Sequence, residues 1–78
     1  MTRLPRDLDG DALAAALSRL GYSITRQTSS HLRLTTTEHH ITIPQHSPLR
    51  IGTRSAILTD VAVHFELTRE QLHQQLFE

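Results

Sequence analysis

The sequence predicts an α+β domain in the form of a two-layer sandwich, with helices over one face of a three-stranded antiparallel sheet. Apolar residues recur at helical spacing near both ends of the chain, whereas the middle of the chain alternates polar and apolar residues with a period of two. The alternating runs are short and separated by turn-forming residues, which is typical of an antiparallel meander with one solvated face. We therefore expect the order helix, three strands, helix and a short C-terminal helix.

The first helix has clear start and stop signals. Residues 1–8 are expected to form a short lead-in, because Pro5 cannot lie inside a helix. Asp9 is suited to the N-cap position, and Gly21 to the left-handed position that ends a helix. The buried face should consist of Leu13, Ala16, Leu17 and Leu20.

The alternation of polar and apolar residues after the first helix predicts three strands, over residues 22–27, 31–35 and 40–43. Pro44 is expected to end the third strand, because proline cannot donate to a sheet ladder. The face toward the helices should carry Tyr22, Ile24, Leu32, Leu34, Ile41 and Ile43. The opposite, polar face should display Thr25, Gln27, His31, Arg33, Thr35, His40 and Thr42.

A connector over residues 44–51 leads to the second helix, which is expected to begin at Gly52 or Thr53. Its apolar stripe is Ile57, Leu58, Val61, Ala62 and Phe65. The last helix has a capping box, with Thr68 as N-cap and Gln71 three residues on. Its apolar residues Leu72 and Leu76 should face the rest of the protein.

Length and composition limit the possible functions. A chain of 78 residues forms at most one domain, here residues 1–78. Eight Arg balance eight Asp plus Glu, and this neutrality argues against strong non-specific binding of nucleic acid. There is no cysteine, no apolar run long enough for a membrane helix and no signal peptide, so we expect a cytoplasmic protein without membrane association.

The residue pattern offers no metal or cofactor site and no known hydrolytic triad. His39 and His40 are adjacent in a predicted strand and should point to opposite faces, and His46 lies across an irregular connector. No G-x-S-x-G motif is present. Most carboxylates lie at helix starts, where capping explains them.

The stretch "GTRSA" at residues 52–56 allows two interpretations. Backbone N–H groups at a helix start attract phosphate, with Thr53 and Arg54 adding a hydroxyl and a charge. Alternatively, Thr53 merely caps the helix and Gly52 makes the turn.

His31 opens the second strand, directly after a turn with the hydroxyls of Ser29 and Ser30. Arg26 and Arg33 are near in sequence, and Arg33 should share the face of His31. An imidazole beside a guanidinium is suited to binding a phosphodiester and transferring a proton. The alternative is an ordinary surface histidine at a strand end.

The order and spacing of several short pieces resemble one known family, the HicA (YcfA-like) mRNA interferase toxins of type II toxin–antitoxin modules. The resemblance runs from about Leu4 to Phe77. Its pieces are "LGY", "RQTSSH", "HITIPQH", "LRIGTRSAIL" and "LTREQL". It implies a fold similar to a double-stranded-RNA-binding domain, an mRNA substrate and a HicB-like antitoxin partner. It also implies that the catalytic residue is the histidine of a Gly-Ser-His motif, here His31.

The leading hypothesis is therefore a metal-independent endoribonuclease with one catalytic histidine. Its candidate substrate-binding residues are Ser29, Ser30, Arg33, Arg26, Thr53 and Arg54. The chain departs from the family motif at Ser29, which replaces a glycine, and at Thr28, which replaces a basic residue. These departures motivate a second hypothesis, an inactive partner-binding protein. A third is a non-catalytic RNA-binding module of the same fold.

Overall fold

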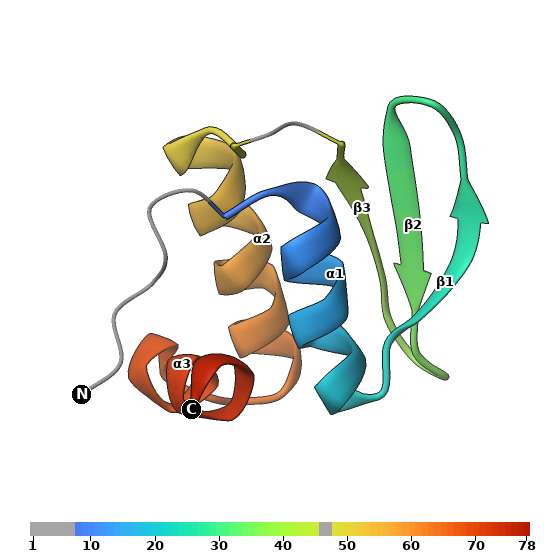
Figure 1. The fold of residues 1–78 in the computed structure, drawn as a ribbon. Helices are drawn as coiled ribbons and strands as arrows, with labels where there is room; N and C mark the ends of the chain where they lie inside the picture. Colours follow the sequence, from blue (N-terminus) through green and yellow to red (C-terminus); the bar gives the residue numbers. More distant parts are fainter. Residues whose placement is uncertain (1–7, 46–47) are drawn as a thin grey trace.

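The computed structural model describes residues 8–45 and 48–78. The expected lead-in up to Asp7 and the connector residue His46 lie outside the described residues. The elements are α1 (Gly10–Leu17), η1 (Ser18–Leu20), β1 (Ser23–Gln27), β2 (His31–Thr35), β3 (His40–Pro44), α2 (Ile51–His64) and α3 (Arg69–Phe77). The helices lie on one side of the sheet, so the α+β prediction is confirmed (Figure 1).

The helical segment made of α1 and η1 begins and ends at two residues that the sequence singled out. The Asp9 carboxylate accepts a 2.7 Å hydrogen bond from the backbone N–H of Ala12, and Gly21 has a φ of 95°. Between them α1 is followed by the single 3-10 turn η1. Ala16 and Leu20, predicted to be buried, are only partly buried. The buried residues of α1 are Gly10, Leu13, Ala14 and Leu17.

The sheet has the order β1-β2-β3, and both neighbouring pairs are antiparallel. The pairing of β1 with β2 is irregular between Ile24 and Arg26. Beyond this point Arg26 lies opposite Arg33, and Gln27 lies opposite Leu32. Directly opposed residues share a face, so the prediction that Gln27 lies on the polar face is wrong. The irregularity has moved Arg26 there instead.

The core lies between the sheet and the helices, and β1 extends beyond it. Ile24 pairs with the buried Leu34, yet it is 52% exposed. In Figure 1 the helices cover β2 and β3, whereas β1 is the strand farthest from them. The largest fully buried side chains are Leu13, Leu17, Leu32, Leu34, Ile43, Leu58, Leu72 and Val61.

The second helix begins at Ile51, slightly earlier than predicted, with Arg50 at the N-cap position. Arg50 has an extended backbone, and its carbonyl accepts the first helical hydrogen bond from the N–H of Arg54. Thr53 is the third residue of α2, so the interpretation that Thr53 caps this helix is wrong. The predicted capping box of α3, formed by Thr68 and Gln71, is confirmed. No described helix has the length and apolar character to cross a membrane.

Candidate functional site

A short turn of three residues places His31 at the start of β2. Thr28 holds both ends of this turn. Its backbone N–H donates to the carbonyl of His31 at 2.9 Å, and its hydroxyl oxygen accepts from the backbone N–H of His31 at 3.1 Å. Among the described non-glycine residues, a positive φ occurs at Glu66 alone. Ser29 therefore adopts its turn conformation without the strain that replacing a glycine can bring.

The imidazole of His31 is exposed, and one of its two ring nitrogens is hydrogen-bonded to the protein. Its Nδ1 lies 2.9 Å from the hydroxyl oxygen of Ser30, and the Ser30 carbonyl accepts from the backbone N–H of Gln45 at 2.8 Å. These bonds tie the ring and the turn to the end of β3. Within the described parts of the chain, Nε2 of His31 has no protein partner. The ring can thus offer Nε2 to a ligand as a donor or an acceptor of a proton.

All three strands contribute to the surface beside this ring. A cavity of about 240 Å³ is lined by Arg26, Thr28, His31, Arg33 and Thr42. Arg26, Arg33 and Thr42 form one row across the sheet, because Arg33 pairs with both of the others. The cavity therefore combines a histidine, two guanidinium groups and two hydroxyl groups.

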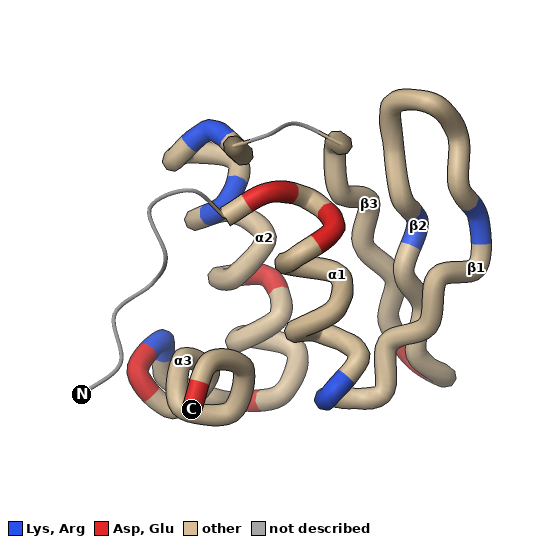
Figure 2. Tube along the Cα trace, viewed as in Figure 1, with Lys and Arg blue, Asp and Glu red and all other residues tan. Residues whose placement is uncertain are grey.

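The charges of this cavity are unbalanced. Figure 2 shows Arg26 and Arg33 as neighbouring basic segments on β1 and β2, and acidic segments at the start of α1 on the helical side. In the described ranges, no carboxylate forms an ion pair with either arginine. The cavity is therefore suited to an anion.

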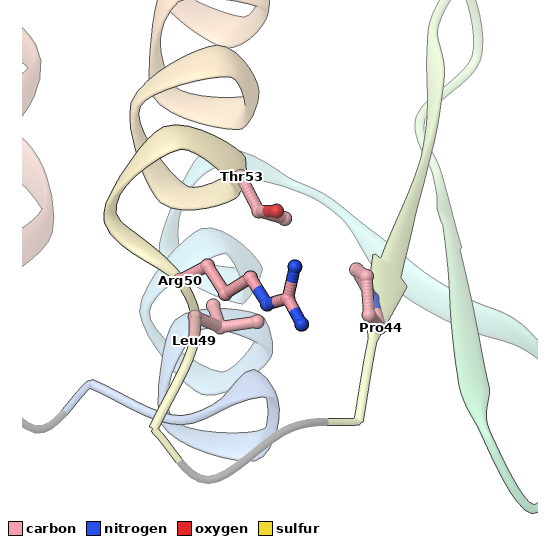
Figure 3. A pocket seen from close by; sticks show the side chains of 4 residues that line it. All are labelled: Pro44, Leu49, Arg50 and Thr53. Atoms are coloured by element: carbon pink, nitrogen blue, oxygen red, sulfur yellow. The ribbon is translucent and has the colours of Figure 1, made fainter.

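A second cavity lies at the start of α2, next to the same end of the sheet. It has a volume of about 260 Å³ and is lined by Pro44, Leu49, Arg50 and Thr53. In Figure 3 the side chain of Arg50 extends toward Pro44. Pro44 is also the strand partner of His31, so the two cavities lie near the same end of the sheet.

Comparison with known families assigns the chain. A family model described as the HicA toxin of bacterial toxin–antitoxin systems matches residues 10–63, which is more than half of the chain. The chain belongs to the HicA toxin family. It is accordingly a toxin of a toxin–antitoxin module, a type of protein that works with an antitoxin partner. No curated protein and no solved structure matches the chain.

In this HicA-family toxin the predicted site residues divide into two groups. His31, Arg26 and Arg33 line one cavity, and Ser30 bonds to the histidine. Ser29 lies in the turn outside both cavities. Of the pair at the start of α2, Thr53 lines the second cavity and Arg54 does not.

Sequence reasoning missed three residues that line the two cavities. Thr28 and Thr42 were expected in a turn and on the polar face without a role, and Arg50 was expected within the connector. Thr28 and Thr42 line the cavity of His31, and Arg50 lines the cavity at α2. No local sequence signal marked Arg50, because α2 begins without a side-chain cap.

A second histidine, His39, is held very differently. Its Nδ1 lies 2.7 Å from the hydroxyl oxygen of Tyr22, and its Nε2 lies 3.3 Å from a carboxylate oxygen of Asp60. Its ring stacks on that of His64 with centroids 4.3 Å apart. Burial, with a smaller contribution from the charge of Asp60, raises the pKa of Tyr22 to about 12.

The sequence-based expectation for His39 and His40 concerned metal binding. His40 lies opposite Thr35 on the polar face, whereas His39 packs with Tyr22 on the side of the helices. Within residues 8–45 and 48–78, no three His, Cys, Asp or Glu side chains are grouped so that they could hold a metal ion.

Proposed function

We propose that this HicA-family toxin is a cytoplasmic mRNA endoribonuclease and that His31 is its catalytic residue. The observation that carries the proposal is the exposed imidazole of His31, which Ser30 orients within a cavity. This cavity holds two arginines that have no ion-pair partner among the described residues. This combination supplies a group that transfers protons and charges that bind a phosphodiester.

RNA contributes its own nucleophile, which explains how so few protein groups can suffice. The 2′-hydroxyl loses its proton and its oxygen attacks the adjacent phosphorus. The bond from phosphorus to the 5′ oxygen then breaks, and that oxygen receives a proton. The products are a 2′,3′-cyclic phosphate and a 5′-hydroxyl. His31 serves as the base for the first proton or as the acid for the second, and one such group contributes about 10²–10⁴-fold to the rate.

The remaining candidate residues bind the RNA backbone. Arg26 and Arg33 stabilise negative charge on the phosphates near His31. Thr53, Arg54 and the backbone N–H groups at the start of α2 bind a more distant phosphate, as helix N-termini do. No step in this mechanism requires a metal ion, because the imidazole moves the proton and the RNA supplies the nucleophile.

The toxin assignment also bears on the partner. We propose a HicB-like antitoxin that neutralises the toxin by covering the polar face of the sheet. Of the alternative functions, the inactive partner-binding protein was motivated by the loss of a glycine at Ser29. The ordinary backbone of Ser29 and the intact bond between Ser30 and His31 support the active enzyme instead.

The direct test compares the purified wild-type protein with His31→Ala on a single-stranded RNA. We expect His31→Ala to cleave about 10²–10⁴-fold more slowly. His40→Ala is the matched control, because His40 is exposed on the same face and contacts neither cavity. It should cleave at the wild-type rate.

Two further measurements test the chemistry of the proposed reaction. The 3′ ends of the products should carry cyclic phosphate, and the wild-type rate should survive addition of a chelator. An all-2′-deoxy substrate should stay intact. Cleavage of the deoxy substrate, or a wild-type rate for His31→Ala, would disprove the proposed mechanism.

A further inference from the structure

We propose that Arg26 and Arg33 together bind one phosphate of the RNA, namely a phosphate next to the one that is cleaved at His31. The inference rests on the proposed nuclease function and assigns a distinct task to the two arginines. It predicts that the smallest efficient substrate contains two consecutive phosphates.

The first observation is the irregular pairing that brings the two arginines together. Ile24 pairs with Leu34, and the next pair is Arg26 with Arg33, so Thr25 is an extra residue in β1. The Thr25 hydroxyl is held by the hydroxyl of Thr35 at 2.8 Å and by the Arg33 carbonyl at 3.4 Å. In a regular ladder Thr25 would face Arg33, and Arg26 would point to the other side of the sheet. This single bulge therefore places Arg26 on the polar face.

The second observation is that the resulting arrangement is unfavourable without a ligand. Like charges directly opposite each other destabilise an antiparallel pair. Both arginines are exposed, and in the described parts of the chain neither has an ion-pair partner. An anion between the two guanidinium groups would remove this repulsion, and guanidinium groups bind phosphate oxygens in pairs of hydrogen bonds.

The third observation is the position of the pair relative to the catalytic group. His31 and Arg33 are two residues apart on β2 and share a face, so their Cα atoms are separated by about 7 Å. Arg26 and Arg33 line the same cavity as His31. The pair can therefore hold one phosphate while the next phosphate along an extended strand reaches the imidazole.

The chemistry of the cavity also limits what this contact can recognise. Its lining residues are two arginines, two threonines and His31, and guanidinium groups bind phosphate oxygens through paired hydrogen bonds. The contact therefore reads the RNA backbone, and it should operate with any base at that position.

The test uses three short RNAs that differ in the number of phosphates. One is a dinucleotide with the scissile phosphate alone, and the other two carry one additional nucleotide, on the 5′ or the 3′ side. For the wild-type protein we expect kcat/KM for one of the trinucleotides to exceed that for the dinucleotide by about 10–100-fold, the range typical of a charge-assisted hydrogen bond. In Arg26→Gln and Arg33→Gln this ratio should fall to a few-fold.

Arg69→Gln is the matched control, because it removes the same charge from α3, where Arg69 contacts Ser55 and Thr59. It should keep the wild-type ratio. Equal kcat/KM values for all three RNAs in the wild-type protein would overturn the inference. So would a ratio that stays at the wild-type value in both arginine variants.

A binding measurement separates failure of this inference from failure of the nuclease function. A short single-stranded DNA resists the proposed chemistry but carries the same phosphates. It should raise the Tm of the wild-type protein and of His31→Ala by a few degrees, and it should raise the Tm of Arg33→Gln clearly less. Without DNA, Arg33→Gln should be slightly more stable than the wild type, because the repulsion is gone. Equal DNA-induced shifts in wild type and Arg33→Gln would contradict the phosphate site, whether or not RNA is cleaved.

Discussion

The two hairpin turns of the sheet are built in the same way and hold their histidines in opposite environments. The sequences are Thr-Ser-Ser-His at 28–31 and Thr-Thr-Glu-His at 36–39. In each, the threonine N–H donates to the histidine carbonyl, at 2.9 Å in the first turn and 2.7 Å in the second. In each, the histidine N–H donates to the threonine hydroxyl, at 3.1 Å and 3.0 Å.

The difference between the two turns lies in what surrounds them. His31 is exposed and bonds to the neighbouring Ser30. His39 is 17% exposed and lies between Tyr22 and Asp60, against His64 of α2. The second turn contacts α2 through His39, which meets Asp60 and His64. The first turn extends past the helices (Figure 1). The comparison shows that tertiary packing, and not the local turn, decides whether each histidine is available for chemistry or fixed in the structure.

The largest contrast is expected from removing each ring in turn. His39→Ala should lower the free energy of unfolding by about 2 kcal/mol, because it leaves the buried hydroxyl of Tyr22 without its partner and removes the stacked ring. His31→Ala should change stability by less than about 0.5 kcal/mol, because its ring is exposed. Denaturant titration of the two variants measures this difference.

The effects of these two substitutions on RNA cleavage should be opposite to their effects on stability. Folded His39→Ala should keep cleaving RNA, whereas His31→Ala should not. A His39→Ala protein that is folded and inactive would assign His39 to the catalytic site and end the distinction between the two turns.

The matched threonines give a smaller and more symmetrical effect on stability. Thr28→Ala and Thr36→Ala should each cost about 1 kcal/mol, since each removes hydroxyl hydrogen bonds that close a turn. Thr28→Ala should also reduce cleavage several-fold, because the turn positions His31, whereas Thr36→Ala should leave cleavage intact. Serine at either position keeps the hydroxyl and serves as the control. Equal losses of cleavage in the two alanine variants would show that the effect is a general loss of stability.

These contrasts correspond to the limits of sequence-based prediction. The cap at Asp9, the left-handed Gly21 and the capping box of Thr68 were predicted correctly, because each depends on interactions within a few residues. The bulge at Thr25 and the exposure of Ile24 were not. Both depend on neighbouring strands and on how far the helices extend over the sheet, and alternation within one strand does not contain this information.

In the candidate site, too, the features that depend on nearby residues were predictable and those that depend on distant residues were not. The position of His31 after a serine-rich turn is visible in the sequence, and so is its proximity to Arg33. The role of His39 is not, because its partners Tyr22 and Asp60 are distant along the chain. Arg50 was missed because the start of α2 was placed too late, as happens where a helix has no side-chain cap.

Tyr22 makes the fixed environment of His39 sensitive to alkaline pH. Its folded pKa of about 12 lies above the ordinary value of 10.0, first because it is buried and second because of Asp60. The neutral phenol thus stabilises the fold fully below pH 10.0, and this contribution is lost as the pH rises toward 12.

Tyr22→Phe should lower the free energy of unfolding by about 1 kcal/mol near neutral pH, because it removes the hydrogen bond to His39. Its stability should lack the wild-type decline above pH 10.0, as measured by urea titration across that range. A parallel decline in both proteins would mean that other groups cause it.

Asp60→Asn should have the smallest effect on stability and can be followed at a single group, since Tyr22 is the one tyrosine of the chain. The Asp60 side chain is 57% exposed, so its ion pair with His39 should contribute less than about 1 kcal/mol, and asparagine retains an oxygen that can accept from Nε2. The substitution removes the lesser of the two causes that raise the pKa of Tyr22. The absorbance of tyrosinate should therefore show that Tyr22 titrates with a lower midpoint pH in Asp60→Asn than in the wild type. This midpoint should still lie above 10.0, because Tyr22 stays buried.

Added salt should lower the midpoint of the Tyr22 titration in the wild type and leave it nearly unchanged in Asp60→Asn. Salt screens the charge of the carboxylate but does not alter the burial of Tyr22. If the two proteins titrate identically at low salt, Asp60 does not act on Tyr22, and burial alone raises the pKa of the phenol.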